Sequence, residues 1–199
     1  MSHHVDYYFA PQSPWTYLGH QRFADMARAA KATVRVLPVD LGRIFPISGG
    51  LPLGQRAPQR QAYRLVDLQR FSDHLKVPLN LHPRFFPVSA DDAARLITAV
   101  DLNDGTDAAM TLTGAVLRAV WAEERNIADP QVLAQLLAEC GMPGARLEAA
   151  RSPAVEARYQ AHTQEAIAAG VFGAPTYVMA GELFWGQDRL DFVQRRLQT

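Results

Sequence analysis

Ser13 lies at a junction that suits both helix capping and catalysis. Residues 5–9 form a short apolar segment typical of a strand, and a helical pattern begins at Trp15, directly after Ser13 and Pro14. A serine before a proline is a favourable helix start, because its hydroxyl accepts a free backbone N–H and proline has none to lose. A hydroxyl at a helix N-terminus can also stabilise an anion. The local sequence alone favours capping, so a catalytic role needs support from the rest of the chain.

Two motifs near the end of the chain are candidates for the same site. In "GVFGAPTYV", Pro175 comes directly before a β-branched segment, and in "FWGQDRL" Gln187 and Asp188 come before a helical pattern. Asp188 is therefore predicted to cap that last helix. A helix N-terminus also suits a ligand carboxylate.

The order of the predicted elements indicates how these motifs could meet. Strands are predicted at residues 5–9, 33–39, 176–179 and 183–185. Helices are predicted at residues 15–31, 60–75 and 106–123, from Ser89, which is expected to cap its helix, from Asp129, near Arg146, from Ser152 to Gly170, and from Asp188. A β-α-β segment, a block of helices and a β-β-α segment make an α/β protein, with a thioredoxin-like four-stranded mixed sheet and a large all-helical insertion. The predicted thioredoxin-like domain comprises residues 1–59 and 171–199, and the inserted helical domain residues 60–170. In such a sheet the turn that carries Ser13 and the loop that ends at Pro175 lie at one edge.

Residues 40–59 are rich in glycine and proline and are predicted to be an irregular loop. Several apolar side chains in this segment argue against disorder, so we expect it to line a pocket. Arg43 lies in this loop and could bind a carboxylate of the substrate.

Composition limits the classes of function. The formal net charge of the 199 residues is zero and no run of lysine or arginine occurs, so we expect no nucleic-acid partner. No segment has the length and hydropathy of a membrane span, and the first residues lack the pattern of a signal peptide, so we expect a cytoplasmic protein. Cys140 is the single cysteine and falls in an apolar helical stripe, where a structural role is expected. No spacing of histidines and cysteines predicts a metal site.

The segments "DYYFAPQSPWTYLG" and "GVFGAPTYVMAGELFWGQDRLDFV" together resemble the 2-hydroxychromene-2-carboxylate isomerase family, which is related to the kappa-class glutathione transferases and the DsbA-type oxidoreductases. The resemblance implies that Ser13 replaces the nucleophilic cysteine of the redox members and activates the thiol of bound glutathione. It also implies a cis-proline at Pro175, with the backbone of Ala174 facing the cofactor. The implied cofactor-binding residues are Ser13, Pro14, Trp15, Arg60, Ala174, Pro175, Gln187 and Asp188, and the implied substrate-binding residues are Arg43 and Phe86.

The resemblance implies a glutathione-dependent isomerase that converts 2-hydroxychromene-2-carboxylate, or a related conjugated aromatic acid, to trans-o-hydroxybenzylidenepyruvate. Reversible addition of a thiolate would turn a conjugated double bond into a single bond that can rotate. A kappa-type glutathione transferase or peroxidase would need the same site and stays an alternative. A redox-inactive, peptide-binding thioredoxin-like protein is the second alternative. A serine hydrolase is excluded by the absence of a matching histidine and acid motif. A homodimer is expected from the resemblance alone.

Overall fold

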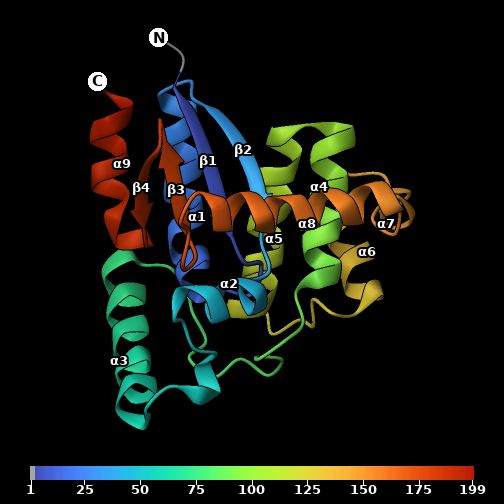
Figure 1. Cartoon of the computed structure of the whole chain (residues 1–199). Helices are drawn as coiled ribbons and strands as arrows, with labels where there is room; N and C mark the ends of the chain where they lie inside the picture. The colour runs from blue at the N-terminus through green and yellow to red at the C-terminus, as the bar shows by residue number, and fades with distance from the viewer. Residues whose placement is uncertain (1–2) are drawn as a thin grey trace.

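A four-stranded mixed sheet forms the centre of the computed structural model, which describes residues 3–199 (Figure 1). The strands are β1 (His4–Phe9), β2 (Thr33–Pro38), β3 (Thr176–Met179) and β4 (Glu182–Trp185), and their order in the sheet is β2-β1-β3-β4. β1 is parallel to β2 and antiparallel to β3, and β3 is antiparallel to β4. The predicted thioredoxin-like sheet is therefore confirmed.

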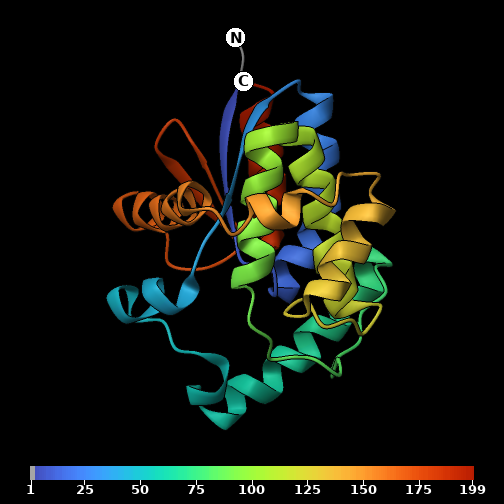
Figure 2. The same cartoon turned by 90° about the vertical axis from the view of Figure 1, so that its right-hand side faces the viewer.

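Helices cover both faces of this sheet, as Figure 2 shows from the side. The helices are α1 (Pro14–Ala29), α2 (Leu41–Ser48), α3 (Pro58–Leu75), α4 (Asp91–Asp104), α5 (Thr106–Trp121), α6 (Pro130–Glu139), α7 (Arg146–Ala149), α8 (Pro153–Ala168) and α9 (Leu190–Leu197). Alternation along β1 directs Tyr7 and Phe9 into a large core with α1, α5 and α9, and Tyr8 into a smaller core with α2 and α8. The large core also includes residues of the helical insertion. The division into two domains stays a prediction.

The segment of residues 40–59, predicted to be an irregular loop, contains a helix, α2, and a short 3₁₀ turn, η1 (Leu53–Gln55). Asp40 caps α2, because its Oδ1 accepts a hydrogen bond of 2.7 Å from the backbone N–H of Gly42. Pro46 lies inside this helix and made the sequence read as a loop. The helix forms nevertheless because Ile44 is fully buried in the smaller core. The loop prediction was wrong for residues 41–48.

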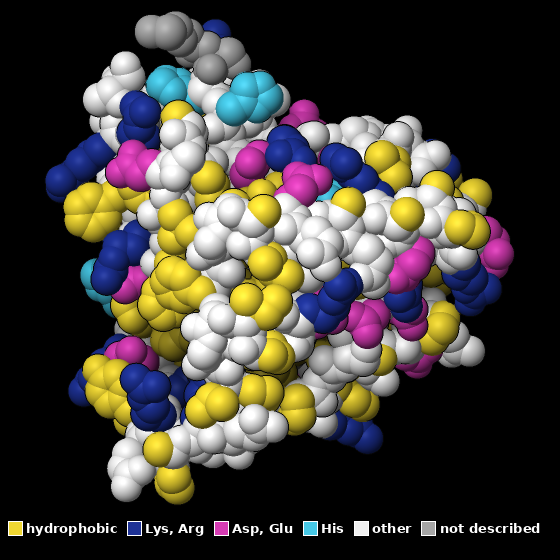
Figure 3. All heavy atoms as spheres, viewed as in Figure 1, with side chains coloured by type: hydrophobic (Ala, Val, Ile, Leu, Met, Phe, Trp, Pro, Cys, Tyr) yellow, Lys and Arg dark blue, Asp and Glu magenta, His cyan; other side chains and the backbone are white. Residues whose placement is uncertain are grey.

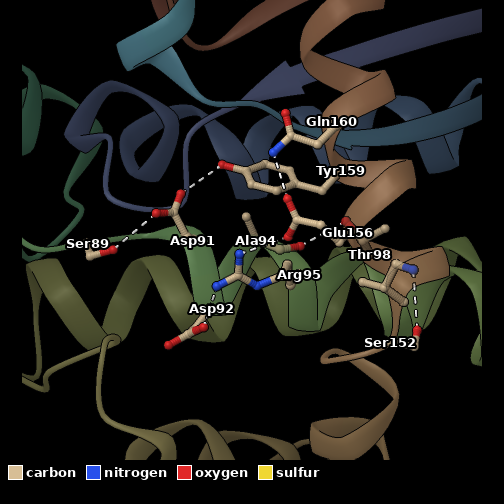
Figure 4. Close-up of polar contacts among 11 residues, drawn as sticks. Ser89, Asp91, Asp92, Ala94, Arg95, Thr98, Ser152, Glu156, Tyr159 and Gln160 are labelled. Carbon is tan, nitrogen blue, oxygen red and sulfur yellow. Dashed lines mark hydrogen bonds and ion pairs between the residues drawn. The ribbon is translucent and has the colours of Figure 1, made fainter.

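Two predicted helix caps are also wrong. Ser89 lies before α4, but Ala90 holds the cap position and the Ser89 hydroxyl contacts Asp91 instead, at 3.5 Å (Figure 4). Asp188 lies within a second 3₁₀ turn, η2 (Gln187–Arg189), and makes no capping hydrogen bond. Ala90 separates Ser89 from α4, and the turn η2 separates Asp188 from the first N–H groups of α9.

The helix start predicted at Ser152 is confirmed: Ser152 caps α8, and its Oγ accepts a hydrogen bond from the N–H of Val155 at 3.3 Å. Figure 4 shows the polar contacts that join α8 to α4 beside it. Arg95 bonds Glu156 at 3.0 Å, and the Tyr159 hydroxyl donates to Asp91 at 3.2 Å. These contacts fix the insertion helices on one another.

Two histidines are buried without charge. The Nε2 of His20 donates to the carbonyl of Met110 at 2.9 Å, so its Nδ1 accepts from the hydroxyl of Tyr7 at 3.1 Å. Burial lowers the pKa of His20 to about 4, and burial does the same for His162. Both imidazole rings are therefore uncharged at neutral pH and belong to the protein interior.

Within residues 3–199, no helix combines the length and the apolar character that crossing a membrane requires.

Candidate functional site

The turn that carries Ser13 and the loop that ends at Pro175 meet at one edge of the sheet, as predicted. Tyr8 near the end of β1 pairs with Thr176 at the start of β3, so both connecting segments leave the sheet at the same place. The N–H of Ser13 donates to the carbonyl of Ala10 at 2.9 Å, which closes a tight turn directly after β1. The sheet therefore brings the beginning and the end of the chain together at this site.

The Ser13 side chain is almost fully buried and caps α1. Its Oγ accepts a hydrogen bond of 3.2 Å from the N–H of Thr16, and its hydroxyl proton has no acceptor among residues 3–199. No acidic residue occupies the first turn of this 16-residue helix, so the positive end of its dipole is not compensated there. Pro14 is buried behind Ser13, and the half-buried Trp15 packs edge-on against Phe71 of α3, with 5.9 Å between ring centres. A negatively charged atom beside the Ser13 hydroxyl would meet a free donor and a favourable dipole.

The loop before β3 leaves the backbone of Ala174 free for a ligand. The Ala174–Pro175 peptide bond is cis, as predicted. Its neighbours are fixed, because the Thr176 hydroxyl donates to the carbonyl of Gly173 at 2.7 Å and the N–H of Gly186 donates to the carbonyl of Pro175 at 2.9 Å. In the described part of the chain, neither the N–H nor the C=O of Ala174 has a hydrogen-bond partner. This pair of groups could bind an extended peptide as a strand would.

Exposed apolar side chains lie close to this free backbone. Phe172 and Trp185 are in contact, with 4.8 Å between ring centres, and both are exposed. Figure 3 shows hydrophobic side chains gathered on the face where the lower ends of β3 and β4 approach α2. The edge that carries Ala174 is therefore flanked by apolar surface.

Gln187 is held against α1 by Arg22. Two nitrogens of the Arg22 guanidinium donate to the Gln187 side-chain and backbone oxygens, at 3.1 and 2.9 Å. The Nε2 of Gln187 is buried and has no partner in the described structure. Asp188 is exposed and bonds Arg189 at 2.6 Å. The side-chain amide nitrogen of Gln187 therefore retains a free donor for a ligand, and the ligand roles of both residues stay predictions.

The predicted cationic residues lie on α2 and α3. Arg43 is exposed on α2, Arg60 is exposed in the first turn of α3, and neither has an ion-pair partner within residues 3–199. Arg56 precedes α3, donates to the carbonyl of Leu51 at 2.8 Å and has its pKa lowered by burial and by the charge of Arg60. These arginines make this part of α2 and α3 positive, and their ligand contacts stay predictions.

Arg64 and the placement of Trp121 were not predicted from the sequence. The Nε1 of Trp121 donates to the carbonyl of Gln12, next to Ser13, at 3.2 Å. Phe86 packs against Trp121 with 4.8 Å between ring centres, and Arg64 lies over both rings. Arg64 follows Arg60 by one helical turn, and this spacing is the signal that could have indicated it.

Neither Cys140 nor the surface cavity nearby belongs to this site. Burial raises the pKa of the Cys140 thiol, which disfavours the reactive thiolate. A cavity of about 790 Å³ lies between α1 and α5 and is lined by Gln21, Met110 and Cys140, but not by Ser13 or any residue of the Ala174 loop. In residues 3–199, no group of three or more histidine, cysteine or acidic side chains is arranged to hold a metal ion.

Comparisons with known proteins agree with this geometry. The family model of the DSBA-like thioredoxin domain matches residues 4–198. The chain is 33% identical to a 2-hydroxychromene-2-carboxylate isomerase of Pseudomonas putida over 191 residues, which cover 94% of this chain and 90% of the relative. It is 29% identical to one of Sphingobium xenophagum over 199 residues, with 99% of each chain covered. A solved structure of a 2-hydroxychromene-2-carboxylate isomerase superimposes with a TM-score of 0.79 at 29% identity, and the match covers 98% of this chain and 94% of that one.

Proposed function

Because the chain belongs to the DsbA-like thioredoxin family, among the 2-hydroxychromene-2-carboxylate isomerases, we propose that it is a glutathione-dependent isomerase of conjugated aromatic acids. Its expected reaction converts 2-hydroxychromene-2-carboxylate, or a related acid, to trans-o-hydroxybenzylidenepyruvate. The observation that carries the proposal is the position of Ser13, which presents a free hydroxyl donor at the N-terminus of α1 beside the free backbone of Ala174.

The residues present suit glutathione. The free N–H and C=O of Ala174 match the peptide backbone of glutathione, and the Ser13 hydroxyl and the α1 dipole suit its sulfur. The buried, unpartnered Nε2 of Gln187 and the cation of Arg60 suit its two carboxylates. Bound glutathione would supply a thiolate that adds reversibly to the conjugated double bond and thereby permits its rotation.

The protein's own residues then have three tasks. The Ser13 hydroxyl donates a hydrogen bond to the sulfur and favours the thiolate anion, which is a minor species for a free thiol with a pKa near ~8.5. Ala174 fixes the cofactor along the sheet edge. Arg43 and Phe86 are the residues proposed to contact the substrate, with Phe86 in the aromatic wall beside Gln12.

The absence of a cysteine at position 13 separates this proposal from oxidoreductase activity. Cys140 is the single cysteine of the chain and has a raised thiol pKa, so the chain offers no pair of thiols for disulfide exchange. A kappa-type glutathione transferase would use the same Ser13 geometry on a different acceptor and is our second candidate. We also propose a cytoplasmic homodimer, which size-exclusion chromatography with light scattering would test.

The first experiment is calorimetric titration of the protein with glutathione, followed by the ultraviolet assay of 2-hydroxychromene-2-carboxylate conversion. We expect binding with release of protons near neutral pH and turnover that requires catalytic glutathione, which is not consumed. Consumption of glutathione with an electrophilic acceptor would favour the transferase. Absence of glutathione binding would refute the cofactor assignment and favour a redox-inactive, peptide-binding protein.

A further inference from the structure

Arg64 is a partly buried cation that lacks a carboxylate partner. Its guanidinium carbon lies 5.4 Å from the centre of the Phe86 ring and 5.8 Å from the ring of Trp121. Within residues 3–199 no acidic side chain pairs with it, and the charge that acts on it is that of another arginine, Arg56. Burial and this arginine lower the pKa of Arg64 to about 10. An anion bound here would offset the cost of holding the guanidinium partly out of water.

Arg64, Phe86 and Trp121, which we call the Arg64 cluster, lie beside the Ser13 turn. Trp121 joins the cluster to that turn through its hydrogen bond to the carbonyl of Gln12. The cluster and Ala174 approach the turn from different elements. Ala174 precedes β3, which lies on one side of β1, whereas Trp121 ends α5, which contacts β2 on the other side of β1. If glutathione binds along Ala174, the Arg64 cluster is left for the second reactant.

We propose that Arg64 binds the carboxylate of the aromatic acid and determines that the site accepts acids, an inference that rests on the proposed function. The guanidinium lies against two aromatic rings, which restrict its motion and leave N–H groups free at its edge. A planar carboxylate can accept two parallel hydrogen bonds from that edge. The aromatic part of such an acid can pack against the half-buried Phe86, whereas Trp121 is fully buried and supports the cluster from the interior.

Other cations of the site suit this task less well. Arg43 is exposed on α2 and has no aromatic contact within residues 3–199, and Arg60 is exposed one turn before Arg64. A cation held in water is hydrated and discriminates weakly between ligands, whereas a partly desolvated one responds strongly to the presence of an anion. Arg64 is therefore the residue from which we expect selection for the acid.

The test compares trans-2-hydroxycinnamate with its amide, each titrated calorimetrically into the glutathione-bound protein. We expect the wild type to bind the acid about 10- to 100-fold more tightly than the amide, the range typical of a hydrogen-bonded charge pair. Arg64→Gln should bind the two compounds equally, with unchanged affinity for the amide and for glutathione. Arg70→Gln is the matched control, because Arg70 lies on the same helix, is exposed and pairs weakly with Asp67 at 3.9 Å. It should keep the full preference for the acid.

Three results would overturn the inference. In the first, the wild type binds the acid and the amide equally well. In the second, Arg64→Gln keeps the preference for the acid. In the third, Arg64→Gln loses affinity for the acid and the amide together, which would indicate that Arg64 only supports the packing of the site. If Arg64→Gln does not fold, Arg64→Lys keeps the charge without the planar fork and should weaken binding of the acid but not of the amide. A wild type that prefers the acid but does not isomerise hydroxychromene carboxylate would refute the proposed function and leave the role of Arg64 intact.

Discussion

Replacing Ser13 by alanine separates its two roles, because capping and thiolate stabilisation have different observables. The Oγ of Ser13 accepts one hydrogen bond, from Thr16, at 3.2 Å, so its removal should cost about 1 kcal/mol of stability. For a domain of this size that loss lowers the melting temperature by roughly 2–4 °C. A donor to a charged sulfur contributes about 1.5–3 kcal/mol, which corresponds to a rise of about 1–2 units in the pKa of the bound thiol.

Ser152→Ala is the matched control. Ser152 also precedes a proline, also caps a helix of 16 residues and also accepts one N–H bond, from Val155, at 3.3 Å. Its loss should lower stability as much as the loss of Ser13. Because Ser152 lies on α8, away from the Ser13 turn, the pKa of bound glutathione should not change.

The assay is the ultraviolet absorbance of the thiolate of bound glutathione as a function of pH, together with thermal unfolding of the free proteins. We expect the thiol of bound glutathione to titrate at higher pH in Ser13→Ala than in wild type and Ser152→Ala, while both variants melt at similar temperatures. If Ser13→Ala and Ser152→Ala differ in neither measurement, the Ser13 hydroxyl acts only as a helix cap and the reasoning fails.

Three more predictions follow from the geometry. A Cβ at Gly19 would lie 2.7 Å from the Cβ of Gln187, so Gly19→Ala should displace Gln187 and weaken glutathione binding. Unchanged affinity, measured by calorimetry, would show that the Gln187 side chain does not hold the cofactor. The two buried histidines have folded pKa values of about 4 against 6.5 when unfolded, so stability should be complete above pH 6.5 and fall between pH 6.5 and 4. Each histidine contributes a slope of up to about 1.4 kcal/mol per pH unit. Chemical denaturation of His162→Gln should therefore show a slope smaller than that of the wild type by up to this amount between about pH 6.5 and 5, and an equal slope would contradict burial of a neutral ring. Ser13→Cys combined with Thr16→Cys places two thiols at the start of α1 and should create insulin-reducing activity. One of these thiols should have a pKa below ~8.5. If both thiols have an ordinary cysteine pKa, the N-terminus of α1 does not favour an anion.

Much of the fold could be predicted from the sequence because local signals and burial agreed. Serine or aspartate before proline marked the starts of helices at Ser152 and Asp129, and both caps are present. The segment of residues 41–48 was misread because Pro46 and the surrounding glycines are loop signals, whereas burial of Ile44 is a tertiary effect that the local sequence does not contain. Ser89 failed as a cap because α4 begins one residue later than expected, and Asp188 failed because a 3₁₀ turn precedes α9.

The candidate site was predictable where it depends on chain order and not where it depends on packing. The meeting of the Ser13 turn with Pro175 follows from the β-α-β and β-β-α arrangement. The position of Arg64 over Phe86 and Trp121 joins three parts of the insertion, and no local pattern connects them. For the same reason the orientation of Gln187 toward Arg22 could not be read from the motif that contains it.

The antiparallel pairing of β1 with β3 has a consequence for biosynthesis. Tyr8 and Thr176 are neighbours in the sheet, yet almost the whole chain separates them. Closing so long a loop is slow, and a chain emerging from the ribosome cannot complete this sheet before β3 has been made. Until then the Ser13 turn lacks the Ala174 edge, and no nascent chain ending before residue 174 can hold a ligand between them. The site can therefore form only after β3 has been synthesised, when the helices of the insertion are already available to form.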